Sequence, residues 1–167
     1  MSIERARAAL SAFGADGRIL EFETSSATVP LAAQALGVEP GRIAKTLSYR
    51  LPEGTALIVA AGDARVDNKR FRARFQTKAR MLSPEEAVER VGHAVGGVCP
   101  FGVNEGVSIW LDISLRRFAT VFPACGSSNS AIELDMAELE RFSNASGWVD
   151  VCSNWQSAPA EERPQNA

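Results

Sequence analysis

Histidine, cysteine and long apolar segments are all scarce in this 167-residue sequence. The only histidine, His93, would have to serve any Ser/His or Cys/His arrangement, and neither a Gly-x-Ser-x-Gly elbow nor a Walker A motif is present. His93 follows Gly92 at an expected helix end, which favours a structural role. The three cysteines, Cys99, Cys125 and Cys152, are widely spaced and predict buried thiols rather than disulfides or a zinc site. We therefore expect no metal and no other cofactor.

No apolar run approaches the roughly 20 residues that a membrane-spanning helix needs. Residues 1–6 lack the apolar block of a secretory signal. A hydrophobic content of 46% with 23% charged residues is typical of a globular protein. The sequence thus predicts one cytoplasmic domain over residues 1–155, followed by a disordered tail over 156–167 that is rich in Pro, Glu and Ala.

Turn and capping signals divide the chain into helices and strands. Thr28 with Pro30 marks one helix start, and Ser83 and Asp135 mark two others. Pro52-Glu53-Gly54 separates two apolar runs and predicts a hairpin. Short connections among strands favour an α/β fold with a mixed sheet over a doubly wound parallel one. We expect helices over 2–13, 28–36, 83–91 and 135–142, and a further helix that begins near residue 67. The expected strands are 18–22, 42–49, 56–61, 78–81, 107–111, 118–124, 131–134 and 148–151.

One lysine shares a strand face with apolar residues. Alternation places Lys45 on the same side as Ile43, Leu47 and Tyr49. A lysine on a buried face is costly unless its ammonium finds partners, and a compact charge in a pocket suits a phosphate, carboxylate or carbonyl oxygen. The alternative is an edge strand from which Lys45 extends to water. The pattern alone leaves both open.

Two glycine-containing loops, 97–102 and 126–130, could present main-chain N–H groups to a ligand, because glycine removes the Cβ obstacle. Each could equally be an ordinary turn. Together with Lys45 they fit a pocket that binds through main-chain donors.

Positive charge gathers in residues 65–80, which carry a net charge of +6 in a chain whose total is −2. Such a patch can hold a phosphate backbone, and we expect tRNA contacts from Lys69, Arg70, Arg72, Arg74 and Lys78. The alternative is a solvated helix face whose charges are paired elsewhere.

Five segments, in order, resemble the YbaK family of prolyl-tRNA-synthetase-associated editing domains. They are Leu36-Gly37-Val38, Ile43-Ala44-Lys45-Thr46-Leu47, Ala61-Gly62-Asp63 with Val66-Asp67-Asn68-Lys69, Val95-Gly96-Gly97-Val98-Cys99-Pro100-Phe101-Gly102, and Cys125-Gly126-Ser127 with Ile132-Glu133-Leu134. The resemblance covers roughly residues 20–142. It implies a single α/β domain with a bent, barrel-like mixed sheet surrounded by helices.

The resemblance also implies a free-standing hydrolase that removes wrongly attached amino acids from tRNA. The expected substrate is tRNA-Pro carrying a small residue such as Cys or Ala, with prolyl-tRNA synthetase as a candidate partner. Since the ester is already activated, donors aimed at its carbonyl oxygen can act with the substrate's own groups and no protein base. By resemblance, Lys45 is the catalytic residue, and the substrate-binding residues are Thr24, Ser25, Thr28, Gly97, Pro100, Phe101, Gly102, Gly126 and Ser127.

Two departures from the family pattern bear on specificity. The 126–130 loop is more polar than the Gly-Lys-Arg-Gly type of some members, and Cys99 could touch the substrate side chain. A non-catalytic tRNA- or nucleotide-binding regulator with this fold is the alternative function, and a protein-interaction domain is a third. We expect a monomer or a weak homodimer.

Overall fold

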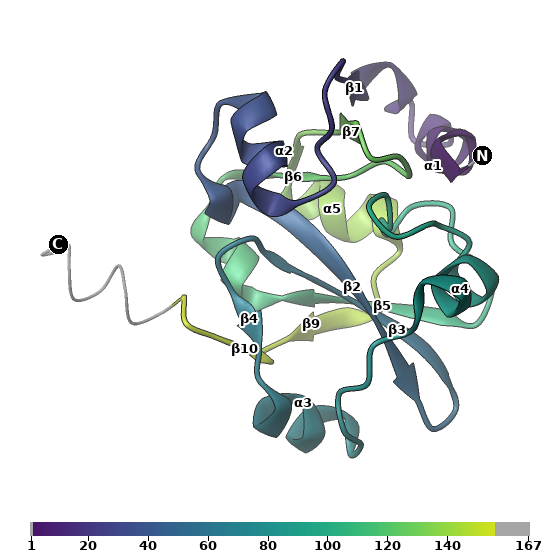
Figure 1. Ribbon diagram of the computed structural model, residues 1–167, viewed down its shortest axis with the longest axis vertical. Coiled ribbons are helices and arrows are strands. Elements are labelled where there is room, and N and C mark those ends of the chain that lie inside the picture. Colours follow the sequence, from purple (N-terminus) through teal and green to yellow (C-terminus); the bar gives the residue numbers. More distant parts are fainter. Residues whose placement is uncertain (1, 156–167) are drawn as a thin grey trace, which may run out of the picture.

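Residues 2–155, which the computed structural model describes, are organised around one long hairpin (Figure 1). Strand β2 (Ile43–Leu51) pairs antiparallel with β3 (Gly54–Ala61) along its length. The hairpin forms because two apolar runs flank a turn at which Gly54 adopts a φ of 110°, a conformation that favours glycine. Every β3 residue after Gly54 is buried, which confirms the predicted central strand.

The hairpin is the middle of a curled six-stranded sheet of order β8-β6-β2-β3-β5-β9. Its pairings are mixed: β2 runs parallel to β6, and β3 parallel to β5. The predicted bent α/β fold is therefore confirmed. The outer strands are β5 (Val107–Asp112), β6 (Thr120–Pro123), β8 (Leu134–Asp135) and β9 (Gly147–Val149), and two small sheets pair β1 (Leu20–Glu21) with β7 (Ser130–Ala131) and β4 (Arg65–Val66) with β10 (Cys152–Ser153).

Helices surround the sheet, with α5 behind it, α1 and α2 towards one end and α3 at the other (Figure 1). Their bounds are α1 (Ser2–Ser11), α2 (Val29–Leu36), α3 (Asn68–Phe75), α4 (Pro84–Glu86) and α5 (Met136–Ser143). The predicted caps are present: Thr28 Oγ1 accepts a hydrogen bond from the Leu31 N–H, and Ser83 and Asp135 each begin a capping box.

Several predicted elements differ in extent. The expected strand 131–134 is split between β7 and β8, because these pair with different partners, β1 and β6. Residues 78–81 contribute only a bridge between Met81 and Tyr49. Residues 16–18 form a 3₁₀ turn before β1, and α4 continues as a π turn over Ala87–Val91. Strands β4 and β10 were not predicted, since each has only two residues.

In the part of the chain that the structure describes, no helix is long and apolar enough to span a bilayer, and no group of three His, Cys, Asp or Glu side chains could hold a metal ion. The predicted tail over 156–167 lies outside the described residues.

Candidate active site

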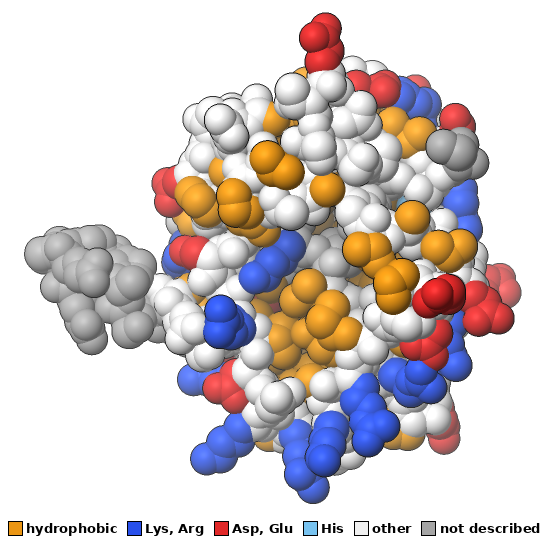
Figure 2. All heavy atoms as spheres, in the orientation of Figure 1, with side chains coloured by type: hydrophobic (Ala, Val, Ile, Leu, Met, Phe, Trp, Pro, Cys, Tyr) orange, Lys and Arg blue, Asp and Glu red, His pale blue; other side chains and the backbone are white. Residues whose placement is uncertain are grey.

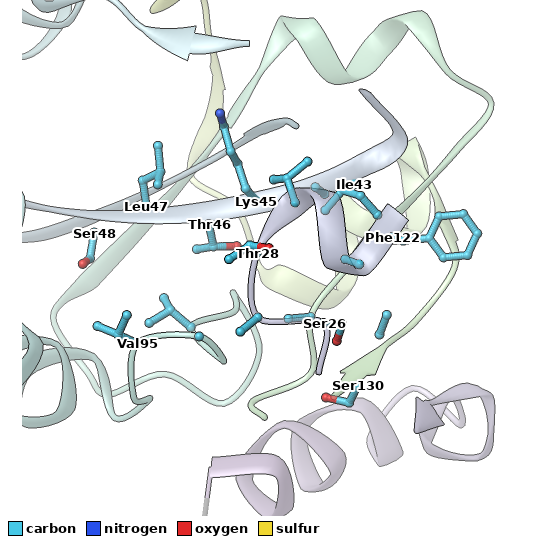
Figure 3. Close-up of a pocket in the computed structure, with 18 of the residues that line it drawn as sticks. Ser26, Thr28, Ile43, Lys45, Thr46, Leu47, Ser48, Val95, Phe122 and Ser130 are labelled. Atoms are coloured by element: carbon cyan, nitrogen blue, oxygen red, sulfur yellow. The ribbon is translucent and has the colours of Figure 1, made fainter. Parts of the chain in front are cut away.

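A cavity of about 310 Å³ opens beside β2 (Figure 3). Its walls come from the start of α2, from β2, from residues 95–98 and from β6 and β7. The lining is mostly apolar and includes several small side chains: Ala32, Ala44, Ala124 and Ala131. Lys45 is its one charged side chain, and no histidine, cysteine or carboxylate lines it. The cavity therefore suits a small uncharged group.

The segment before α2 is held over the cavity by the loop that follows β6. The Ser26 N–H donates to the Ser128 carbonyl at 2.6 Å, and the Phe22 N–H donates to the Asn129 carbonyl at 2.8 Å. The Asn129 side chain returns a bond to the Phe22 carbonyl at 2.8 Å. These contacts place Ser26 and Thr28 in the cavity wall.

Strand β2 has an open side where it meets the cavity. It pairs with β6 only through Ile43 and Ala44, and further along the Ser48 carbonyl accepts from the Leu82 N–H at 3.1 Å. Between these points, no strand among residues 2–155 covers that side. Alternation directs the Thr46 main-chain N–H and C=O to the same side as those of Ser48, towards the cavity.

Thr46 also supplies a free hydroxyl to this site. Its Oγ1 is buried and has no hydrogen-bond partner within the described residues, and Figure 3 shows it beside Thr28. An unsatisfied buried hydroxyl costs about 1–3 kcal/mol, which a ligand could offset by bonding to it. The sequence analysis overlooked Thr46 because attention fell on its charged neighbour, although alternation along β2 was a sufficient signal.

Lys45 extends from the side of β2 opposite to Thr46 (Figure 3). Its Nζ donates to the Ala64 carbonyl and, at 3.4 Å, to the Gly62 carbonyl. Burial lowers the pKa of Lys45 below its usual value. The predicted alternation is correct, but the ammonium is held by main-chain carbonyls rather than extending to water.

The turn that holds Lys45 is itself anchored. Asp63 accepts two bonds from the Arg117 guanidinium, at 2.9 and 2.5 Å. A Cβ on Gly62 would lie 2.1 Å from the Pro40 carbonyl oxygen, so the turn packs closely on the residues before β2. The Gly62 and Ala64 carbonyls are thus fixed relative to the strand that carries Lys45.

Of the predicted substrate-binding residues, Thr28 lines the cavity together with Lys45, and the others do not. Gly97 lies one residue beyond the lining residue Gly96, and its backbone packs on Gly126. Thr24 and Ser25 are exposed. Ser127 Oγ donates to Ser130 Oγ at 2.7 Å, which orients a lining residue.

Gly102 and Gly126 pack against α1 rather than against the cavity. A Cβ on Gly102 would lie 2.5 Å from the Arg5 carbonyl oxygen, and one on Gly126 would lie 2.4 Å from that of Ser2. Pro100 and Phe101 are buried as well. The glycine loops therefore support the cavity wall from behind.

Cys99 and His93 form a buried pair behind the cavity. His93 Nε2 lies 2.7 Å from the Phe101 carbonyl oxygen and 3.5 Å from Cys99 Sγ. Burial raises the pKa of the Cys99 thiol to about 12, so the thiol is neutral and unreactive. Cys99 is absent from the cavity lining, which leaves no contact with a substrate side chain there.

His93 should make stability depend on pH. Burial lowers its pKa in the folded state, the hydrogen bond to the Phe101 carbonyl opposes this shift, and the charge of Arg5 adds to it. The unfolded chain binds a proton near pH 6.5 and the folded one does not, so stability should be full above that pH and fall as the pH drops through it, by at most about 1.4 kcal/mol per pH unit. Denaturant unfolding between pH 7.5 and 5.5 measures this loss.

The matched variant is His93→Gln, whose amide can still donate to the Phe101 carbonyl. Because His93 is the only histidine, its replacement should flatten the profile in that range. An equal slope in the variant would assign the effect to another group.

The basic residues after β4 lie on the face shown in Figure 2, gathered along its lower margin over α3 and the following segment. Arg70 pairs with Asp150 at 3.0 Å, and Arg74 stacks 4.7 Å above the Trp110 ring. Lys69, Arg72 and Lys78 are exposed, and within residues 2–155 they have no ion-pair partner.

These features define a class of protein: a mixed α/β domain whose central strand presents main-chain groups, a hydroxyl and a lysine beside a small apolar cavity. Such a site can bind a small acyl group and donate hydrogen bonds to its carbonyl oxygen.

The model of the family described as the aminoacyl-tRNA editing domain matches residues 23–142. The chain therefore belongs to this family and is an aminoacyl-tRNA deacylase, as the sequence predicted. It is 54% identical over 158 residues to the uncharacterized protein YwhH of Bacillus subtilis, which covers 93% of this chain and 100% of YwhH.

Two further relatives carry functional names. A candidate Cys-tRNA(Pro)/Cys-tRNA(Cys) deacylase of Enterococcus faecalis, EbsC, is 28% identical over 104 residues, which cover 61% of this chain and 63% of EbsC. The crystal structure of a candidate trans-editing enzyme for prolyl tRNA synthetase superposes with a TM-score of 0.83 at 30% identity, covering 92% of this chain and 98% of that one.

Proposed function

We propose that this protein hydrolyses, in trans, the ester of tRNA-Pro that carries a small uncharged amino acid such as Cys or Ala. The observation that carries the proposal is the small apolar cavity beside the open side of β2. A charged aminoacyl side chain would enter a lining that offers no counter-charge except Lys45. The names of EbsC and of the structural relative support tRNA-Pro as the substrate.

In this proposal the acyl carbonyl lies against the open side of β2. The Thr46 main-chain N–H stabilises the negative charge that develops on the carbonyl oxygen as water attacks. The Thr46 and Thr28 hydroxyls position the aminoacyl group in the cavity. No histidine or carboxylate lines the cavity, so the attacking water is positioned by the substrate's own ribose hydroxyl or amino group.

Lys45 acts at the nucleotide side of the ester. Its ammonium lies on the other side of β2 from Thr46, where it can exchange a carbonyl partner for an oxygen of the acceptor end. Two loops support the cavity wall, and Thr24 and Ser25 lie on the exposed segment that leads to it. The supporting loops contain Gly97, Pro100, Phe101, Gly102, Gly126 and Ser127. Aminoacyl-tRNA is the proposed partner, and prolyl-tRNA synthetase is a second candidate. The proposed location of the protein is the cytoplasm.

The test is a deacylation assay with purified protein and tRNA-Pro charged separately with Ala, Cys or Asp. We expect Ala and Cys to be released at least about 100-fold faster than Asp. The Lys45 ammonium is held on the opposite side of β2 from Thr46, so the Asp carboxylate would be buried without a partner at a cost of several kcal/mol. Equal rates would contradict the assigned cavity. Tight tRNA binding without hydrolysis of any ester would favour the non-catalytic regulator instead.

A further inference from the structure

A second hollow, of about 220 Å³, lies between the turn end of the β2–β3 hairpin and the segment after α3. Three cations line it, namely Arg50, Lys78 and Arg80, together with Leu51, Pro52 and Thr77. No acidic side chain belongs to its lining. A hollow with this lining attracts an anion.

The cations are brought together by backbone pairing. The Arg50 N–H donates to the Arg80 carbonyl at 2.8 Å, which places two like charges on neighbouring extended segments. Like charges directly opposite each other destabilise such a pairing. Arg50 is relieved by an ion pair with Glu86, whereas Lys78 and Arg80 have no such partner within residues 2–155. An anion seated between them would remove the repulsion.

The hollow lies next to the candidate active site along β2. Ser48 and Leu82, which line the first cavity, are joined by a hydrogen bond, and the next such bond along the same two segments joins Arg50 and Arg80. Two residues of extended chain span about 7 Å. A nucleotide chain whose 3′ end enters the first cavity can therefore reach the cations within about one nucleotide.

We propose that Arg50, Lys78 and Arg80 form a subsite for a backbone phosphodiester near the esterified 3′ end of the tRNA. This assignment rests on the proposed function and adds to it the path of the acceptor strand. It differs from contacts along α3, where Arg70 is paired with Asp150 and Arg74 is stacked on Trp110. Those two cations are already engaged by the protein itself.

The test compares the double variant Lys78→Gln/Arg80→Gln with wild type on three esters: alanyl-tRNA, an alanylated trinucleotide with its phosphodiesters, and alanyl-adenosine, which has none. We expect KM to rise about 10-fold for the first two with kcat unchanged, and no change for alanyl-adenosine. The slope of log Kd against log salt for uncharged tRNA should fall by about 0.7, because one single-strand phosphate contact is lost. The control, Arg116→Ala/Arg141→Ala, removes equal charge elsewhere and should leave all three esters unaffected.

Unchanged KM and salt slope in a variant that melts like wild type would overturn the subsite. A free-anion site would appear as binding of inorganic phosphate that the double variant abolishes while tRNA affinity stays the same, and this too would overturn it. If wild type hydrolyses no ester but its tRNA affinity depends on Lys78 and Arg80, the subsite stands and the proposed hydrolysis fails.

Discussion

Replacing Lys45 by alanine is expected to reduce deacylation by about 100-fold or more, because its ammonium positions the acceptor end and a misplaced ester reacts about that much more slowly. The domain should stay folded. The ammonium is only partly buried, and the Gly62 and Ala64 carbonyls that it leaves can bind water instead. Single-turnover rates with alanyl-tRNA and thermal melting by circular dichroism measure the two quantities.

Two further substitutions separate charge from packing. Lys45→Met keeps the aliphatic stem and should be as inactive as Lys45→Ala, whereas Lys45→Arg should retain part of the activity. Arg141→Ala removes a cation from α5, behind the sheet, and should leave the rate unchanged. Full activity in a folded Lys45→Met variant would refute the role assigned to Lys45.

The anchored turn over residues 62–64 holds the Lys45 ammonium in place before a substrate binds. Two carbonyl oxygens hold its ammonium without neutralising it, and the Arg117–Asp63 pair keeps that turn in place. An anionic or ester oxygen competes well with a carbonyl for an ammonium whose solvation is incomplete. The lysine is thus positioned beforehand, which limits the conformational entropy lost on binding.

Features that depend on neighbours in sequence were predictable. The Thr28 cap, the capping boxes at Ser83 and Asp135, and the β2–β3 hairpin follow from side chains within a few residues of each other. The placement of Lys45 on the Ile43 and Leu47 face followed from alternation alone. The resemblance then identified the family, because its five segments occur in order.

Features that depend on distant contacts were not predictable. The open side of β2 exists because β6 leaves the pairing after Ala44, which no local pattern records. Ser26 belongs to the cavity wall because it bonds to Ser128, about a hundred residues away in sequence. The pairing of Arg70 with Asp150 joins α3 to the chain after β9, so a basic stretch whose pairing the sequence left open is partly engaged.

The two glycines expected to face the substrate, Gly102 and Gly126, also depend on distant contacts, and replacing them should strongly lower the stability of the domain. Gly102 and Gly126 have φ values of 67° and 91° and lie against main-chain atoms of Arg5 and Ser2. We expect Gly102→Val and Gly126→Val to unfold the domain or lower its stability by several kcal/mol, since the strain of a positive φ adds to a collision with backbone. The midpoint of urea denaturation measures this loss.

The sharper comparison uses alanine at four glycines. Gly14 and Gly37 have φ values of 71° and 70° with open space where a Cβ would point, so Gly14→Ala and Gly37→Ala report backbone strain alone, about 1 kcal/mol each. Gly102→Ala and Gly126→Ala should lower the free energy of unfolding clearly more, and the excess measures the packing of α1 against the loops behind the cavity.

The same variants can be assayed without denaturant, at a temperature where they remain folded. Their rate on alanyl-adenosine should fall less than that of Lys45→Ala, because neither glycine lines the cavity. Equal losses at all four positions, with activity lost only at Gly102 and Gly126, would instead mean that these glycines face the substrate.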